Sequence, residues 1–172
     1  MQTVHLRAQA VARIVHKRRT KYSPRAGLWL YETLSDEEVH NLITDGGRVA
    51  LHTYIYGLAA DRVAASLGAD GLSYIGLTND GTAPAAGDTT LTGELSGDGL
   101  SRTQGTVLLP TGAGVITTIS NQFTFVGASQ QVQKTALFDA GAGGNMAHEL
   151  LFTQRTLVTS DTITITFSIT LT

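Results

Sequence analysis

The sequence contains no cysteine, which excludes disulfides, thiolate nucleophiles and cysteine-ligated metal clusters. Charged residues make up only 15%, against about 25% in average globular proteins, and this excludes a charge-rich disordered chain and a solvated coiled coil. No apolar run approaches the ~18 residues of a transmembrane helix, so we expect no membrane partner. The N-terminus lacks a clean apolar stretch, so we also expect no secretory signal. The 172 residues suit one domain with an appendage.

Acidic residues are absent before Glu32, although the net charge of the whole chain is only −2. Seven of the twelve basic residues precede that point: Arg7, Arg13, Lys17, Arg18, Arg19, Lys21 and Arg25. Residues 1–31 therefore carry +7, whereas residues 32–172 hold five basic and fourteen acidic residues, a net charge of −9. The pattern indicates a basic arm on an acidic body. Such an arm commonly binds an acidic surface of protein or nucleic acid, the alternative being a solvated arm without a dedicated partner.

Two periodicities compete in the basic arm. Apolar and polar residues alternate in its first half, as in a strand, whereas Ala8, Val11 and Val15 fit one face of a helix. The Ala-rich and Arg-rich composition favours the helix, which we expect here. Ser23–Gly27 has the composition of a turn, and the apolar cluster Leu28–Tyr31 is expected to dock the arm.

Helix signals continue through residues 32–68. Residues 35–38, Ser-Asp-Glu-Glu, form a capping box with acids at the positive end of a helix, and apolar residues follow on one face. Further helical pieces are expected over residues 45–55 and 59–67, the last ending at a glycine.

Threonine and glycine become dense after residue 68, and the helix signals disappear. The expected strands are 72–77, 102–109, 115–126, 132–138, 146–152 and 162–171, with turns at 110–114 and 139–145. Ile163 to Leu171 alternates apolar residues with Thr or Ser, as in a half-buried antiparallel strand. We therefore expect a mainly β protein with three parts. They are a basic N-terminal arm (1–31), a helical section (32–68) and an antiparallel β-sandwich (69–172).

Catalytic and metal-binding motifs are missing from the pattern. His148 and Glu149 are adjacent, so on a strand they point to opposite faces, and we expect His148 to be ordinary sheet surface or edge. A calcium site at Asn79, Asp80 and Asp88 is the alternative considered, but the spacing is not that of an EF-hand. The glycine-rich turn at 139–144 opens no helix and lacks the ending of a phosphate loop. We expect no enzyme activity, no cofactor and no metal.

Nucleic acid is the less favoured partner for the arm. Its basic residues would neutralise several phosphates, but the acidic body would repel a nearby duplex. No aromatic residue is interleaved with the basic residues before Tyr22, so a stacking platform is missing.

Several segments follow one another in a characteristic order. Tyr74-Ile-Gly-Leu-Thr-Asn-Asp-Gly-Thr-Ala-Pro-Ala-Ala-Gly-Asp-Thr-Thr-Leu-Thr-Gly-Glu-Leu95 is followed by Gly99-Leu-Ser-Arg102. Lys134-Thr-Ala-Leu-Phe-Asp139 and its glycine-rich turn come next, and Asp161-Thr-Ile-Thr-Ile-Thr-Phe-Ser-Ile-Thr-Leu171 closes the chain. As an ordered set over roughly residues 43–172, they resemble small virion structural proteins of tailed bacteriophages, variously head decoration, tail or fibre proteins.

The resemblance implies a non-enzymatic virion protein, assembled in the host cytoplasm, and it carries no catalytic residue. We expect a capsid-associated decoration or cement protein, because the chain is short and lacks fibre repeats. A tail, neck or fibre-adaptor protein is the alternative. A carbohydrate-binding module is a further alternative, although Trp29 is the only tryptophan and precedes the expected sandwich.

Other copies of the chain and the major capsid or tail proteins are the expected partners, in a homo-oligomer or symmetric assembly. The expected partner-binding residues are Arg7, Arg13, Lys17, Arg18, Arg19, Lys21, Arg25, Trp29 and Tyr31.

Overall fold

The computed structural model describes residues 8–23, 28–40, 42–45, 47, 71–109 and 116–171. Strands dominate this part of the chain. They are β1 (Ala8–Ser23), β2 (Leu28–His40), β3 (Leu42–Ile43), β4 (Tyr74–Thr78), β5 (Thr103–Gln104), β6 (Thr106–Leu108), β7 (Ile116–Thr124), β8 (Ser129–Phe138), β9 (Met146–Val158) and β10 (Thr162–Leu171).

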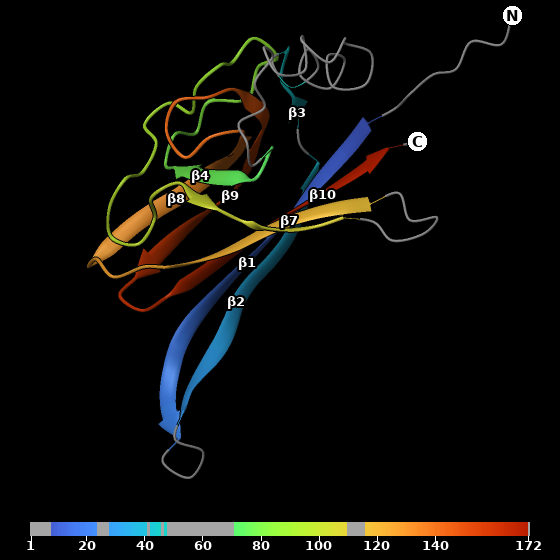
Figure 1. The fold of residues 1–172 in the computed structure, drawn as a ribbon. Coiled ribbons are helices and arrows are strands. Elements are labelled where there is room, and N and C mark those ends of the chain that lie inside the picture. Colours follow the sequence, from blue (N-terminus) through green and yellow to red (C-terminus); the bar gives the residue numbers. More distant parts are fainter. Residues whose placement is uncertain are drawn as a thin grey trace, which may run out of the picture.

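The strands form two antiparallel sheets of five strands each (Figure 1). Sheet A has the order β2-β1-β10-β7-β6, and sheet B has the order β3-β9-β8-β4-β5. The final strand, β10, lies at the centre of sheet A between β1 and β7, so both of its backbone edges are paired. The mainly β, sandwich-like architecture expected from the sequence is thereby confirmed.

One face of each sheet contributes to a shared hydrophobic core, as in a sandwich. Sheet A supplies Ala12 and Ile14 from β1 and alternate residues of β10, among them Ile165 and Phe167. The main contributions of sheet B are Ile75, Leu77, Val132, Leu137, Leu150 and Leu157. Thr164 and Thr166 alternate with the buried residues of β10 and are half-buried, which confirms one apolar and one Thr/Ser face.

The helical conformation expected for the arm is wrong, because residues 8–23 form a strand. β1 pairs antiparallel with β10, from Ala8 opposite Leu171 to Lys17 opposite Thr162. This pairing places Ala12 and Ile14 in the core, and the free energy of that burial outweighs the modest helix preference of Ala and Arg. The competing alternation of apolar and polar residues therefore indicated the correct structure.

The expected start of the helical section is also wrong, because residues 28–40 form β2 and pair with β1. The acids of the supposed capping box bind partners on other strands. Asp36 accepts hydrogen bonds from Arg13 on β1, and Glu37 accepts them from Thr153 on β9. The expected helical pieces over 45–55 and 59–67 fall outside the described residues, except for Asp45 and Gly47.

The expected strands of the second half are present with adjusted limits. The segment around residues 102–109 splits into β5 and β6, and β6 pairs with β7, Val107 lying opposite Ile119. β9 is longer than expected, because it continues past Phe152 to Val158. The glycine-rich segment at 139–145 connects β8 to β9, as predicted.

The hairpin of β1 and β2 extends well beyond the sandwich. Lys17 is the last residue of β1 that pairs with β10. Of the six residues that follow, five pair only with β2, and Thr20 lies at a bulge. At about 3.3 Å per residue, this two-stranded part is roughly 20 Å long. Figure 1 shows it as a narrow ribbon leaving the sandwich at the end opposite the last residues of β10.

The place of β1 in the core generates a stability prediction. Ile14→Ala should lower the free energy of unfolding by about 2–5 kcal/mol, because it empties a fully buried position between the sheets. Val15→Ala, one residue along and half-buried on the opposite face, should cost about 1 kcal/mol or less. Chemical denaturation followed by circular dichroism measures both. Equal, negligible effects would show that β1 is a dispensable arm.

Candidate partner-binding hairpin

The projecting end of the hairpin exposes an unusual number of large apolar side chains. Five of them retain between 45% and 49% of their accessible surface, and together we call them the hairpin tip. They are Tyr22, Leu28, Trp29, Leu30 and Tyr31. A two-stranded ribbon has no second layer to cover its faces, and a clustered apolar surface of this kind marks an interaction site.

One face of the tip is an aromatic and cationic cluster. Tyr22 lies opposite Trp29 in the strand register, and their ring centroids are 5.3 Å apart with the planes tilted by 58°. The guanidinium of Arg19 lies 4.3 Å from the centroid of the Trp29 ring, a cation–π contact. Because residues paired across an antiparallel ladder share a face, Tyr31 opposite Arg19 joins this cluster. The tip thus presents two tilted aromatic rings in contact, next to a positive charge.

Acidic residues of β2 form ion pairs with arginines where the hairpin joins the sandwich. Asp36 accepts two hydrogen bonds from Arg13, at 2.8 and 2.5 Å, on the exposed side of the sheet. Glu37 points the other way, toward sheet B. It accepts hydrogen bonds from the hydroxyl of Thr153 at 3.0 Å and from Arg155. β2 therefore ties the hairpin to both sheets of the sandwich.

A buried carboxylate holds the point where the hairpin leaves the sandwich. Asp161 Oδ2 lies 3.0 Å from His16 Nε2 and accepts a hydrogen bond from Arg18 Nη2 at 3.2 Å. The backbone amide of Val158 also donates to it, at 3.1 Å. Burial alone would raise the pKa of Asp161, but the hydrogen bonds from Arg18 and His16 outweigh burial and hold that pKa below its usual value.

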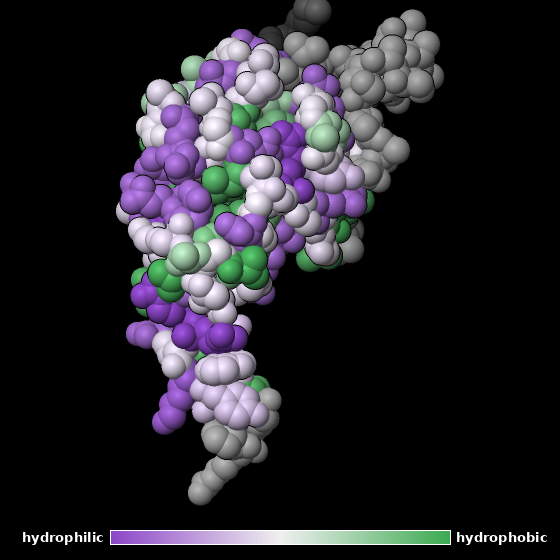
Figure 2. Space-filling model, turned by 90° about the vertical axis from the view of Figure 1, so that its left-hand side faces the viewer, coloured by the Kyte–Doolittle hydropathy of each residue, from purple (hydrophilic) through white to green (hydrophobic). Residues whose placement is uncertain are grey.

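The structure distributes the residues expected to bind a partner between two roles. Arg13 and Arg18 are engaged by Asp36 and Asp161, so they stabilise the hairpin. Arg19, Lys21, Trp29 and Tyr31 lie together on its projecting part and are exposed, whereas half-buried Lys17 still pairs with Thr162 of β10. Arg7 and Arg25 fall outside the described residues. Figure 2 shows the projection, with hydrophilic residues where it leaves the body and paler ones toward its end.

Sequence reasoning missed the buried partners of the arm. Asp161 and Glu37 are far from the basic residues in the sequence, and no spacing rule connects residues that only sheet pairing brings together. Tyr22 was missed for a simpler reason. The composition of its segment favours a helix, whereas a strand with a bulge places Tyr22 opposite Trp29.

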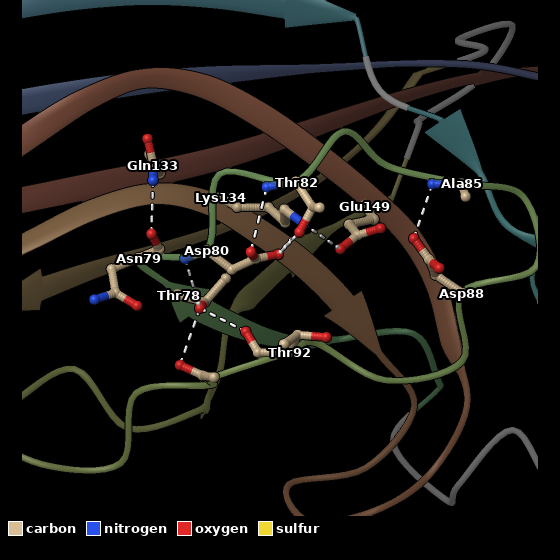
Figure 3. Close-up of polar contacts among 11 residues, drawn as sticks. Thr78, Asn79, Asp80, Thr82, Ala85, Asp88, Thr92, Gln133, Lys134 and Glu149 are labelled. Atoms are coloured by element: carbon tan, nitrogen blue, oxygen red, sulfur yellow. Dashed lines mark hydrogen bonds and ion pairs between the residues drawn. The ribbon is translucent and has the colours of Figure 1, made fainter.

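A second polar cluster holds the loop after β4 against sheet B (Figure 3). The ammonium of Lys134 lies between two carboxylates, 2.6 Å from Asp80 Oδ2 and 3.3 Å from Glu149 Oε1. Burial first, and the neighbouring Asp88 carboxyl second, raise the pKa of Glu149 to about 6. Of the three residues considered for a calcium site, Asp80 is thus paired with a lysine and Asp88 lies beside Glu149, while the carbonyl of Asn79 accepts a hydrogen bond from Gln133. Among the described residues, no three His, Asp or Glu side chains are arranged to hold a metal ion.

His148 is not surface or edge as expected. It is buried in β9 beside Phe167, with 6.5 Å between ring centroids, and burial lowers its pKa to about 4. Glu149 contacts Lys134 on the other side of the sheet, so the predicted opposite orientation of the two neighbours is confirmed. The ring is an uncharged part of the core at neutral pH.

The segments that carry the resemblance meet in space. Arg102 donates two hydrogen bonds to Glu94, both at 2.6 Å, and one to the carbonyl of Gly143 at 2.7 Å. Its guanidinium also lies 3.4 Å from the centroid of the Phe138 ring. One arginine thereby links the loop after β4, the segment before β5 and the glycine-rich turn, so these motif residues act in folding.

Comparisons with known proteins add no family. No family model matches the chain, and no curated protein matches it. Within the described ranges, no helix has the length and apolar character needed to cross a membrane.

The buried carboxylate at the base of the hairpin predicts a large effect for Asp161→Ala. The substitution removes the partner of buried His16 and of Arg18, and we expect a loss of about 3 kcal/mol in the free energy of unfolding. Asp36→Ala is the matched control, because it breaks an exposed ion pair on the same hairpin and should change stability little. Denaturant unfolding compares them, and similar losses for both would contradict the assignment.

The opposed pKa shifts of His148 and Glu149 predict a pH dependence. The pKa of His148 is about 4 when folded and 6.5 when unfolded, so its contribution to stability falls as pH drops through that window. The pKa of Glu149 is about 6 when folded and 4.5 when unfolded, so its contribution rises as pH drops from 6 to 4.5. The two contributions therefore oppose each other between pH 6 and 4.5.

Removing either ionisable group should reveal the pH dependence that the other contributes to the free energy of unfolding. Relative to wild type, His148→Leu should gain stability as pH falls from 6 to 4.5, and Glu149→Gln should lose it. Each slope should be at most about 1.4 kcal/mol per pH unit. Unfolding free energies measured across this range test the pair, and parallel pH profiles for wild type and both variants would contradict the shifts.

Proposed function

We propose that this chain is a non-enzymatic structural protein of a tailed-phage virion that joins neighbouring subunits through the β1–β2 hairpin. The observation that carries the proposal is the hairpin tip, a projecting group of five exposed apolar and aromatic side chains. A soluble domain gains no stability from exposing such a cluster, whereas an assembly protein gains an interface when the tip is covered.

The rest of the molecule supports an assembly role. The sandwich offers a rigid base, since β1 is paired on both sides until it leaves the sheet. Asp161 and Glu37 fix the direction of the hairpin at its base through bonds to both sheets. A binding element that is held in its bound shape loses little conformational entropy on association. Many identical copies on a particle would add their weak contacts together.

The charge distribution favours a protein surface over nucleic acid. The register places Glu32 opposite Arg18 and Glu38 opposite Arg13, and Asp36 is paired with Arg13. These acids lower the positive potential that binding to a phosphate backbone requires. An acidic protein surface with an apolar patch fits the tip better, because it complements the exposed rings and the remaining lysines.

We place the protein on the capsid as a decoration or cement protein, and a tail, neck or fibre adaptor is the alternative. The ordered segments resemble those of small virion structural proteins, which supports a virion role. Copy number separates the two, since a shell protein is present in far more copies per particle than a tail part.

Immunogold electron microscopy and quantitative mass spectrometry of purified particles test the proposal. We expect label over the head and a copy number in the range of the major capsid protein. Label confined to the tail would replace the capsid placement with the alternative. Absence of the chain from particles would overturn the proposed function.

Substitution of the tip tests the proposed contact. Trp29→Ser with Tyr31→Ser should reduce incorporation into particles on the order of tenfold or more, because exposed aromatic residues dominate interface energies. The melting temperature should stay unchanged, since both side chains are exposed. Val126→Ser, an exposed apolar substitution outside the hairpin, is the control. Full incorporation of the tip variant would show that the hairpin does not make the contact.

A further inference from the structure

Residues 79–93 form a loop that lies against sheet B, and we call it the β4 loop. A bridge between Thr78 and Glu94 closes its base. Leu91 holds one part of the loop, because it packs in a small apolar cluster with Ala136 and Phe138 of β8. Polar contacts hold the remainder, so their strength decides how firmly the loop stays closed.

Three carboxyl groups lie around the ammonium of Lys134 beneath this loop (Figure 3). Asp80 and Glu149 are 2.6 and 3.3 Å from the ammonium, and the side chain of Asp88 contacts that of Glu149. Asp80 and Asp88 belong to the loop, whereas Lys134 and Glu149 are on β8 and β9. With every group ionised, the cluster would hold two negative charges that Lys134 does not compensate, which is costly in a shielded place.

One oxygen of Glu149 is buried without a hydrogen-bond donor. The residue is only 1% exposed, its Oε1 faces Lys134, and its Oε2 has no partner among the described residues. A buried carboxylate oxygen without a donor costs free energy. Protonation removes this cost, because a carboxylic acid has an O–H that can donate to a neighbouring carboxylate. Asp88 is that neighbour.

The surroundings of the two carboxyl groups place the proton on Glu149. The amide of Ala85 donates to Asp88 Oδ2 at 2.8 Å, and this bond, ahead of the contact with Glu149, holds the pKa of Asp88 below its usual value. Burial, ahead of the contact with Asp88, raises the pKa of Glu149 to about 6. Surroundings that separate the pKa values of two neighbouring carboxyl groups make one the acid and the other the base. Glu149 is therefore the donor and Asp88 the acceptor.

The other elements packed at this place do not supply a competing positive charge. β4 carries no charged residue, and Leu42 of β3 is the residue that pairs with Glu149. His148 faces the core on the opposite side of β9. Asp45 follows β3, and its amide donates to the carbonyl of Ala86 at 2.7 Å, which brings a further acid to the same turn. Additional negative charge favours retention of the proton.

We propose that Asp88 and Glu149 share one proton, and that this hydrogen bond is a latch that closes the β4 loop on sheet B in acid. When Glu149 ionises, two facing carboxylates repel each other where the hydrogen bond had been. The contact of Lys134 with Asp80 and the packing of Leu91 remain, so the loop loosens without unfolding the sandwich.

The direction of the pH dependence follows from linkage. The pKa of Glu149 is about 6 with the loop closed and 4.5 when the carboxyl group is free in water. The latch therefore contributes fully below pH 4.5 and is lost as the pH rises through about 6. It does not depend on the proposed virion role, because the β4 loop and the hairpin tip lie in different parts of the molecule (Figure 1).

Carbon-detected NMR of side-chain carboxyl groups in the full chain tests the shared proton. In wild type, Asp88 and Glu149 should show a common inflection near pH 6. Asp88→Asn should lower the midpoint of Glu149 by about one pH unit, because the asparagine amide donates to Glu149 and favours its charged form. Asp98→Asn, at an exposed position before β5, is the matched control and should leave the midpoint unchanged. A midpoint that Asp88→Asn does not move would overturn the shared proton.

Hydrogen exchange of β4-loop peptides tests the latch, measured by mass spectrometry at two pH values and corrected for intrinsic exchange rates. The pKa values of Glu149 in the closed and open loop make opening roughly eightfold less favourable at pH 5 than at pH 7.5. Glu149→Gln should abolish this difference, because glutamine can donate to Asp88 at either pH. Asp98→Asn should retain it, and circular dichroism checks that each variant is folded.

Two results would overturn the latch. One is a wild-type loop that opens equally at both pH values, a measurement that needs no variant. The other is an undiminished pH effect in Glu149→Gln. His148 does not account for a local change between pH 5 and 7.5, because its pKa is about 4 and its ring faces the core.

Discussion

The pairing of β1 with β10 is the interaction on which the rest of the structure depends. It joins the beginning and the end of the chain at the centre of sheet A, and it buries Ala12 and Ile14 opposite the residues of sheet B. Because β1 is held along ten residue pairs, its remaining residues leave the sandwich in a defined direction, with β2 beside them. β1 therefore contributes one part to the core and another to the projecting part of the hairpin.

The basic residues of the β1–β2 hairpin have different surroundings at its base and further out. The basic residues nearest the sandwich are neutralised by carboxylates that come from β2 and from the turn just before β10. Those further out, Arg19 and Lys21, accompany exposed aromatic and aliphatic side chains instead. The contrast between a basic N-terminal segment and an acidic remainder thus becomes a gradient along one hairpin, with ion-paired charges at its base and exposed charges further out.

Much of the second half of the chain was predictable, because its signals are local. The alternation of β10, the turn residues between β8 and β9 and the pairing of β6 with β7 all depend on residues close in sequence. Residues 8–23 were misjudged because Ala and Arg favour helices, and the strand β10 whose pairing overrides this preference lies more than a hundred residues away. Residues 35–38 match a capping box, but β2 pairs with β1 instead. His148 was misplaced for a similar reason, since only the packing of Phe167 against it shows that its side of β9 faces the core.

The sequence by itself determined three features of the chain. They are a basic, aromatic N-terminal segment, an acidic remainder, and a last strand with one apolar and one threonine face. These properties follow from residue type and alternation, which need no partner to be recognised. Only the tertiary structure decided that the basic segment is a strand of the core sheet and that its end projects from the sandwich. Those features depend on strand order and register, which arise from contacts between residues far apart in the chain.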